Sequence, residues 1–121
     1  MDARLREGIR LFNAGQFFES HDILEQFYQD TEDINKPFLE GLIELAVAFR
    51  LYNDFGEVKG PVRMIYQALI RFENYQTTYL DIRVKDLSEA MEAWAKEADA
   101  GGKPLASIPK IPLRGFGSAY S

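Results

Sequence analysis

The residues best suited to chemistry are the single histidine, His21, and the glutamate four residues after it, Glu25. Residues four apart on a helix lie on the same face, so the imidazole and the carboxylate can act together. Aromatic residues, Phe18 among them, occur on both sides of the pair, and His21 falls near the centre of the apolar face that they predict. We therefore expect both side chains to be largely buried and to have partners, because burying an unpaired charge costs several kcal/mol.

Three interpretations of this pair remain open. His21 and Glu25 can form a hydrogen-bonded pair that fixes the packing of two helices, with Tyr28 nearby. They can instead supply two ligands of a divalent metal ion, although zinc or iron requires three or four. In the third interpretation, His21 is an acid–base catalyst that Glu25 orients.

Further metal ligands are available on the next predicted helix, where Glu40 and Glu44 lie one turn apart. Asp22, next to His21, is a supporting candidate. Two antiparallel helices could bring these side chains together, as in the carboxylate and histidine sites of helical bundles. Alternatively, the two glutamates form a solvated helix edge, and Arg50 neutralises one of them. The predicted metal ligands are His21, Glu25, Glu40 and Glu44, with Asp22 and Tyr28 in support.

An all-α fold must position these residues, because apolar residues recur with the period of a helix and no stretch alternates as a strand does. The pattern predicts a bundle domain over residues 1–100, and the repeat of Leu-Phe-Asn as Leu-Tyr-Asn forty residues later favours two stacked helical hairpins. Residues 76–79 are predicted to be a linker. The five predicted helices span residues 2–13, 16–29, 37–53, 61–75 and 86–100.

Residues 101–121 differ from this domain in composition. They contain three prolines and are predicted to form an extended C-terminal tail that cannot be helical. If the tail packs on the bundle, it does so through its apolar residues, which are Leu105, Ile108, Ile111 and Phe116.

The composition excludes some classes of site and disfavours some classes of partner. The formal net charge is −5, and the excess negative charge lies in residues 1–100, which disfavours nucleic acid and suits a metal cation or a basic partner. With no cysteine, disulfides, thiolate metal sites and cysteine nucleophiles are excluded. Neither a signal peptide nor a membrane-spanning run occurs, so no membrane association and a cytoplasmic protein are expected.

Two blocks of the sequence resemble a known family. Residues 15–25 followed by Tyr28 are similar to a signature of His, three residues, Glu, two residues, then Trp or Tyr, and residues 38–48 are similar to the apolar helix that follows. The signature is that of the prokaryotic domain-of-unknown-function family 309, and the resemblance covers about residues 8–70. It implies an α-helical bundle of unassigned function. It also implies a proposed metal role for His21, Glu25 and Tyr28.

This sequence departs from the family pattern at several positions. Asp22 stands where Glu is more usual, and Glu40 and Glu44 stand where Gln is common. Glu57 replaces a frequent Asn, and Pro61 a frequent Ala. The added carboxylates make this version more acidic, which either strengthens a cation site or merely adds to an acidic surface.

Two classes of function follow. The first is a metal-dependent enzyme of the hydrolase class, whose divalent cation is held by His21, Glu25 and one or both later glutamates. The second is a non-catalytic interaction module, in which the His21–Glu25 pair is structural. The helical hairpins and the tail would then bind a protein partner, and a spare apolar helix face allows a homodimer. Substrate, reaction and metal identity cannot be read from the sequence.

Overall fold

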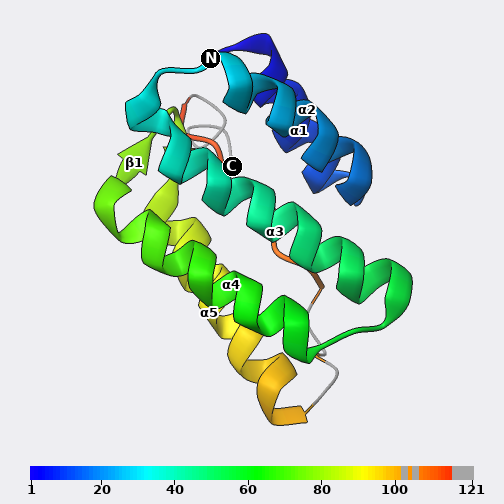
Figure 1. The fold of residues 1–121 in the computed structure, drawn as a ribbon. Helices are drawn as coiled ribbons and strands as arrows, with labels where there is room; N and C mark the ends of the chain where they lie inside the picture. Colours follow the sequence, from blue (N-terminus) through cyan, green and yellow to red (C-terminus); the bar gives the residue numbers. More distant parts are fainter. Residues whose placement is uncertain (102–103, 105–106, 116–121) are drawn as a thin grey trace.

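Five α-helices form most of the protein in the computed structural model, which describes residues 1–101, 104 and 107–115 (Figure 1). The predicted all-α fold is therefore confirmed, and each predicted helix is present with ends shifted by a few residues. Among the helices of the described residues, none combines the length and the apolar character that crossing a bilayer demands. The helices are α1 (Ala3–Asn13), α2 (Phe17–Asp30), α3 (Lys36–Phe55), α4 (Lys59–Phe72) and α5 (Val84–Gly101).

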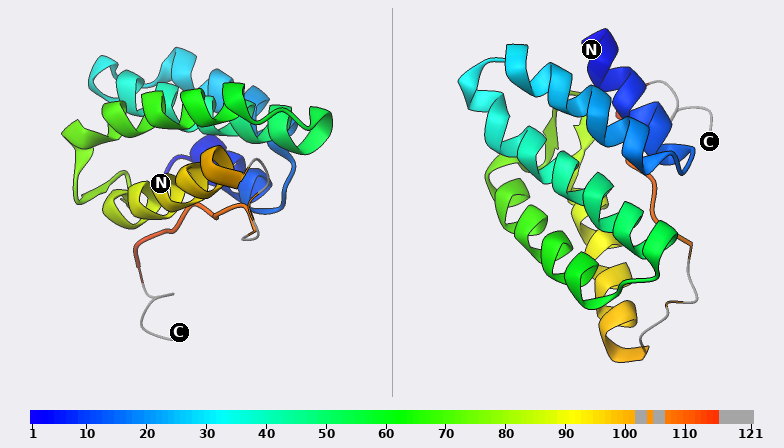
Figure 2. Two further views of the ribbon diagram at one scale, coloured as in Figure 1. Left: turned by 90° about the horizontal axis from the view of Figure 1, so that it is seen from below. Right: turned by 45° about the vertical axis from the view of Figure 1, so that its right-hand side comes forward.

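The helices pack in two layers (Figure 2). Helices α2, α3 and α4 lie side by side in one layer, and α1 and α5 lie beneath them in the other. Helices that follow each other in the sequence pack together, so α1 with α2 and α3 with α4 form two helical hairpins. The surface of the three-helix layer that points away from α1 and α5 is called the outer face below.

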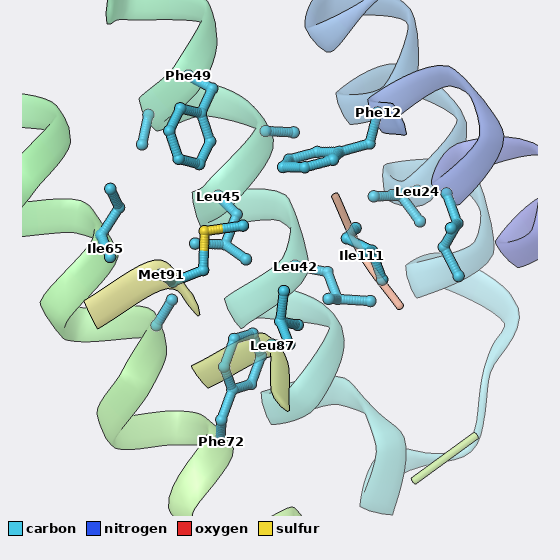
Figure 3. Close-up of a cluster of buried hydrophobic side chains, with 14 of the residues drawn as sticks. Phe12, Leu24, Leu42, Leu45, Phe49, Ile65, Phe72, Leu87, Met91 and Ile111 are labelled. Atoms are coloured by element: carbon cyan, nitrogen blue, oxygen red, sulfur yellow. The ribbon is translucent and has the colours of Figure 1, made fainter. Parts of the chain in front are cut away.

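Helix α3 is central because one side of it carries the apolar residues at helical spacing. Phe38, Leu42, Leu45 and Phe49 are fully buried on this side, where they join the main core (Figure 3). Gly41 lets α4 approach closely, since a Cβ atom there would lie 2.5 Å from Cε1 of Phe72. The helix runs to Phe55, beyond the predicted end, and stops where Gly56 adopts a left-handed φ of 69°.

The predicted linker at residues 76–79 is wrong in part. After a 3₁₀ turn (Glu73–Tyr75), the strand β1 (Thr78–Tyr79) pairs with β2 (Ile82–Arg83) in an antiparallel hairpin. Leu80 and Asp81, which connect the strands, both have positive φ, as a tight hairpin turn requires. Two residues per strand are too few to show the alternation by which a strand is recognised in a sequence.

Residues 107–115, called the strap below, run along the bundle in an extended conformation. Ile111 is buried in the core and Ile108 packs against it, as predicted. The Asn13 amide holds both backbone groups of Ile111, with its Nδ2 donating to the carbonyl at 3.1 Å and its Oδ1 accepting from the N–H at 2.7 Å. The strap also hydrogen-bonds to β2, because the N–H of Arg83 donates to the carbonyl of Pro112. Leu105 and Phe116, the other predicted contacts, lie outside the described residues.

Candidate functional site

The predicted burial of His21 and Glu25 is wrong. Their side chains are 33% and 45% exposed, and the imidazole Nε2 lies 3.5 Å from the Glu25 Oε1. The buried side of α2 is formed instead by Phe17, Ser20, Leu24 and Phe27. Ser20 fixes this orientation, because its buried hydroxyl donates a 2.7 Å hydrogen bond to the Gly8 carbonyl of α1. The pair therefore lies at the edge of the packed side of the helix.

Phe18 explains why the apolar face was misplaced. The sequence suggested that this ring belongs to the core, but it is 49% exposed. It lies under the guanidinium of Arg50, whose central carbon is 4.4 Å from the ring centroid, a cation–π contact. Because the predicted apolar face of α2 included Phe18, its centre lay closer to His21 and Glu25 than the buried side of the helix does.

Glu40 and Glu44 both bind Arg71 of α4. One Oε of Glu40 lies 2.7 Å from an Nη of Arg71, and the Glu44 Oε1 accepts from the Arg71 Nε at 2.7 Å. The side chains of Glu40 and Arg71 are a little over one third exposed, and that of Glu44 is only 18% exposed. The predicted neutralising residue, Arg50, is therefore wrong: it faces Asp54 at 3.7 Å, one turn further along α3.

Tyr28 completes this network from α2. Its hydroxyl donates a 2.9 Å hydrogen bond to the Oε1 of Glu40, the oxygen that Arg71 leaves free. The hydrogen bond to the Glu40 carboxylate raises the pKa of the Tyr28 hydroxyl, because losing the proton would place two negative oxygens side by side. Glu40 is thus held from two helices at once.

An open pocket of about 320 Å³ lies between α2, α3 and α4, on the outer face, because its α3 residues are opposite the buried side of that helix. Three of the four predicted ligands line it, together with Tyr28, whereas His21 and Asp22 do not. Asp22 is exposed on α2. The pocket is lined by Glu25, Tyr28, Glu40, Ile43, Glu44 and Arg71.

The side chains as placed do not form a metal-binding set. Within the described residues, no three His, Asp or Glu side chains converge as a metal ion would require. Both oxygens of Glu40 already have partners, and so does the Oε1 of Glu44. A cation that used these two glutamates would have to displace Arg71.

Sequence reasoning missed Arg71 as a site residue. A signal was present, because Glu44 and Arg71 lie at similar chain distances from the loop between the third and fourth helices. In an antiparallel helical hairpin, positions at equal distances from the turn are opposite each other. Considering the charges of the fourth helix in this way would have paired the arginine with the glutamate.

Comparison with protein families gives one match. The model of the family described as "Domain of unknown function (DUF309)" matches residues 5–64, about half of the chain. The matched segment contains most of α1, all of α2 and α3 and the first residues of α4. It therefore includes every predicted ligand, but Arg71 lies beyond it. No curated protein matches the chain.

Proposed function

The chain belongs to the DUF309 family through residues 5–64, and from this premise we propose that it is a binding module whose outer-face pocket receives a basic side chain of a partner protein. The family carries no assigned function, so the proposal depends on the site itself. In this interpretation, the protein catalyses no reaction, and His21 and Glu25 contribute charge and shape to the edge of the pocket.

The observation that supports this proposal most strongly is the charge imbalance of the pocket. Three carboxylates line it against one guanidinium, so the pocket has a negative excess even after Arg71 has bound both of its glutamates. Within the described residues, the ion pair of Glu25 is the one with His21, which is charged only when protonated. A second cationic group is therefore the complementary ligand.

The shape of the pocket suits a side chain. All lining residues lie on helices, and Arg71 and Tyr28 hold Glu40 in place before any ligand arrives, which reduces the entropy lost on binding. Ile43 adds an apolar surface for the aliphatic part of a lysine or arginine side chain, while the carboxylates face its charged end.

The test is a titration followed by NMR, with N-acetyl-argininamide and N-acetyl-lysinamide as the probes. We expect saturable shifts of the Ile43 methyl and Tyr28 ring signals. N-acetyl-glutaminamide, which is neutral, should leave these signals in place. Glu25→Gln should weaken binding by several fold, and the matched control Glu89→Gln, an exposed carboxylate on α5, should not. Equal shifts with the neutral probe would reject the proposal.

A divalent metal ion in the same pocket is the second candidate, because three of the predicted ligands line one cavity. This candidate includes the metal-dependent hydrolase inferred from the sequence and requires that Arg71 leave Glu40 and Glu44. Its test is elemental analysis of protein purified without a metal-chelating step, together with melting temperatures in Mg²⁺, Mn²⁺ and Zn²⁺. Stoichiometric metal that His21→Ala and Glu25→Gln both remove would make the metal site the leading function.

A further inference from the structure

A second feature of the outer face is a cluster of Phe18, Arg50 and Phe55, called the Arg50 clamp below. The Arg50 guanidinium lies between the two rings, 4.4 Å from the centroid of Phe18 and 5.9 Å from that of Phe55. The rings are 49% and 63% exposed, so a large apolar area around the cation is in contact with solvent. Exposed aromatic residues grouped around an arginine are typical of the centre of a protein interface.

Arg50 is only weakly paired. Its Nε is buried and makes no hydrogen bond within the described residues, and its ion pair with Asp54 has an Nε–Oδ2 distance of 3.7 Å. The pocket on the same face shows the opposite imbalance, with more carboxylates than cations. One face therefore carries a weakly paired cation beside a pocket with excess negative charge.

The clamp and the pocket both involve half-buried residues of α3. Glu40 and Glu44 lie one turn apart on the same side of the helix, whereas Arg50 is rotated by about 120° from Glu44 and contacts Phe18 of α2. Six residues correspond to about 9 Å along the helix axis, so the two features are adjacent without touching. On α2, Phe18 and Glu25 are seven residues apart, about two turns, so these two residues of the clamp and the pocket lie on the same side of that helix.

We propose that the outer face is the interface of a symmetric homodimer, in which Arg50 of each copy enters the Glu25–Glu40–Glu44 pocket of the other. This inference rests on the proposed function and names a second copy of the chain as the source of the basic side chain. A two-fold axis places each surface against the same surface of the second copy, so a face with a cation beside an anionic pocket is complementary to itself. Each copy has a formal net charge of −5, so association depends on such local pairing.

Charge reversal tests this arrangement, with sedimentation equilibrium as the measurement. We expect the wild-type protein to dimerise. Arg50→Glu and Glu25→Lys should each raise the dimer dissociation constant by about 100-fold. Both residues are partly exposed, so each variant should keep its helical circular dichroism. The matched control Arg6→Glu, on the exposed side of α1 in the other layer, should leave the dimer intact.

The decisive result comes from mixing the two monomeric variants. Arg50→Glu keeps an acidic pocket and gains an acidic clamp, whereas Glu25→Lys gains a basic group in its pocket and keeps the Arg50 clamp. Opposite charges then face each other at both contacts of a mixed pair, so an equimolar mixture should form a heterodimer. A monomeric wild type, or a mixture that stays monomeric, would overturn the symmetric arrangement.

The failure of this inference can be separated from the failure of the proposed function. The argininamide titration is repeated on Arg50→Glu, in which a second copy does not fill the pocket. Binding of argininamide by this variant, together with a monomeric wild type, would overturn the homodimer and leave the binding pocket standing. Absence of binding by the variant would overturn both.

Discussion

The two sides of α3 differ in nearly every respect although they belong to one helix. The inner side consists of apolar residues with no exposed surface, such as Phe38, Leu42 and Phe49. The outer side carries Glu40, Glu44 and Arg50, all partly exposed. The two glutamates pair with Arg71 of α4, and Arg50 pairs with Asp54 one turn further along α3. The inner side therefore determines the fold, and the outer side is free to specify what the protein binds.

The comparison also shows how far a contact depends on its surroundings. Phe49 and Phe55 are the same residue type six positions apart on one helix. Phe49 is fully buried and packs edge to face on Phe12 and Trp94, whereas Phe55 is 63% exposed beside Arg50. Burial, not residue type, decides whether such a ring contributes to stability.

The largest expected effect comes from exchanging these two rings for alanine. Phe49→Ala should lower the free energy of unfolding by about 3–5 kcal/mol, because it empties a fully packed site. Phe55→Ala should change it by less than about 0.5 kcal/mol. Urea denaturation followed by circular dichroism measures both. A similar loss from both substitutions would show that the outer side also supports the fold.

Gly41 sharpens the comparison from within the inner side. Gly41→Ala places a methyl group 2.5 Å from the buried Phe72 ring, so it should cost about 1–3 kcal/mol of stability by overpacking. Gly101→Ala, at the end of α5, is the control, since no atom outside its chain neighbours and its own helix backbone lies within 4 Å of the added methyl. The control should be neutral or gain up to about 1 kcal/mol of helix propensity. Thermal unfolding of both variants measures the two changes in stability. If Gly41→Ala is as stable as the wild type, α4 can move away from α3.

Arg71→Gln tests how much the outer network contributes to the fold. Because these ion pairs are partly solvated, we expect a loss of only about 1 kcal/mol, smaller at high salt. Arg63→Gln, on an exposed part of α4, is the control and should have no measurable effect. Denaturation midpoints at low and high salt provide the measurement, and a loss as large as that of Phe49→Ala would contradict the division between the two sides.

The smallest expected effect concerns pH. The pKa of Tyr28 is raised in the folded protein by its hydrogen bond to Glu40, so the neutral hydroxyl is favoured by folding. This contribution to stability is fully present below the ordinary tyrosine pKa of 10.0 and is lost as the pH rises through the higher folded value. An absorbance titration of the phenolate, compared with Tyr28→Phe, identifies the step. Glu40→Gln should lower the pKa, and an unchanged titration would show that the hydrogen bond is absent in solution.

The fold could be predicted from the sequence more fully than the site. Helix periodicity depends on neighbours along the chain, so α3 was predicted from its buried residues alone. The burial of His21 depends on which side of α2 meets α1, and this is fixed by Ser20, a small polar residue without an apolar signal. The partner of Glu44 is 27 residues away, on a helix whose position is set by packing. The partners of the site residues are set by contacts between residues far apart in the sequence, and local sequence patterns do not predict such contacts.

The strap has a consequence for the order in which the protein matures. Helices that are neighbours in the sequence form most of the packing, so α1 to α4 can associate as the chain is synthesised. The contact between Asn13 and Ile111 joins residues 98 apart and cannot form until residue 111 has left the ribosome. The side-chain amide of Asn13 therefore lacks these two hydrogen bonds until the strap has been synthesised. Assembly of the core is completed only after the strap has been synthesised, and until then the nascent chain lacks the contacts of Ile111 with the bundle.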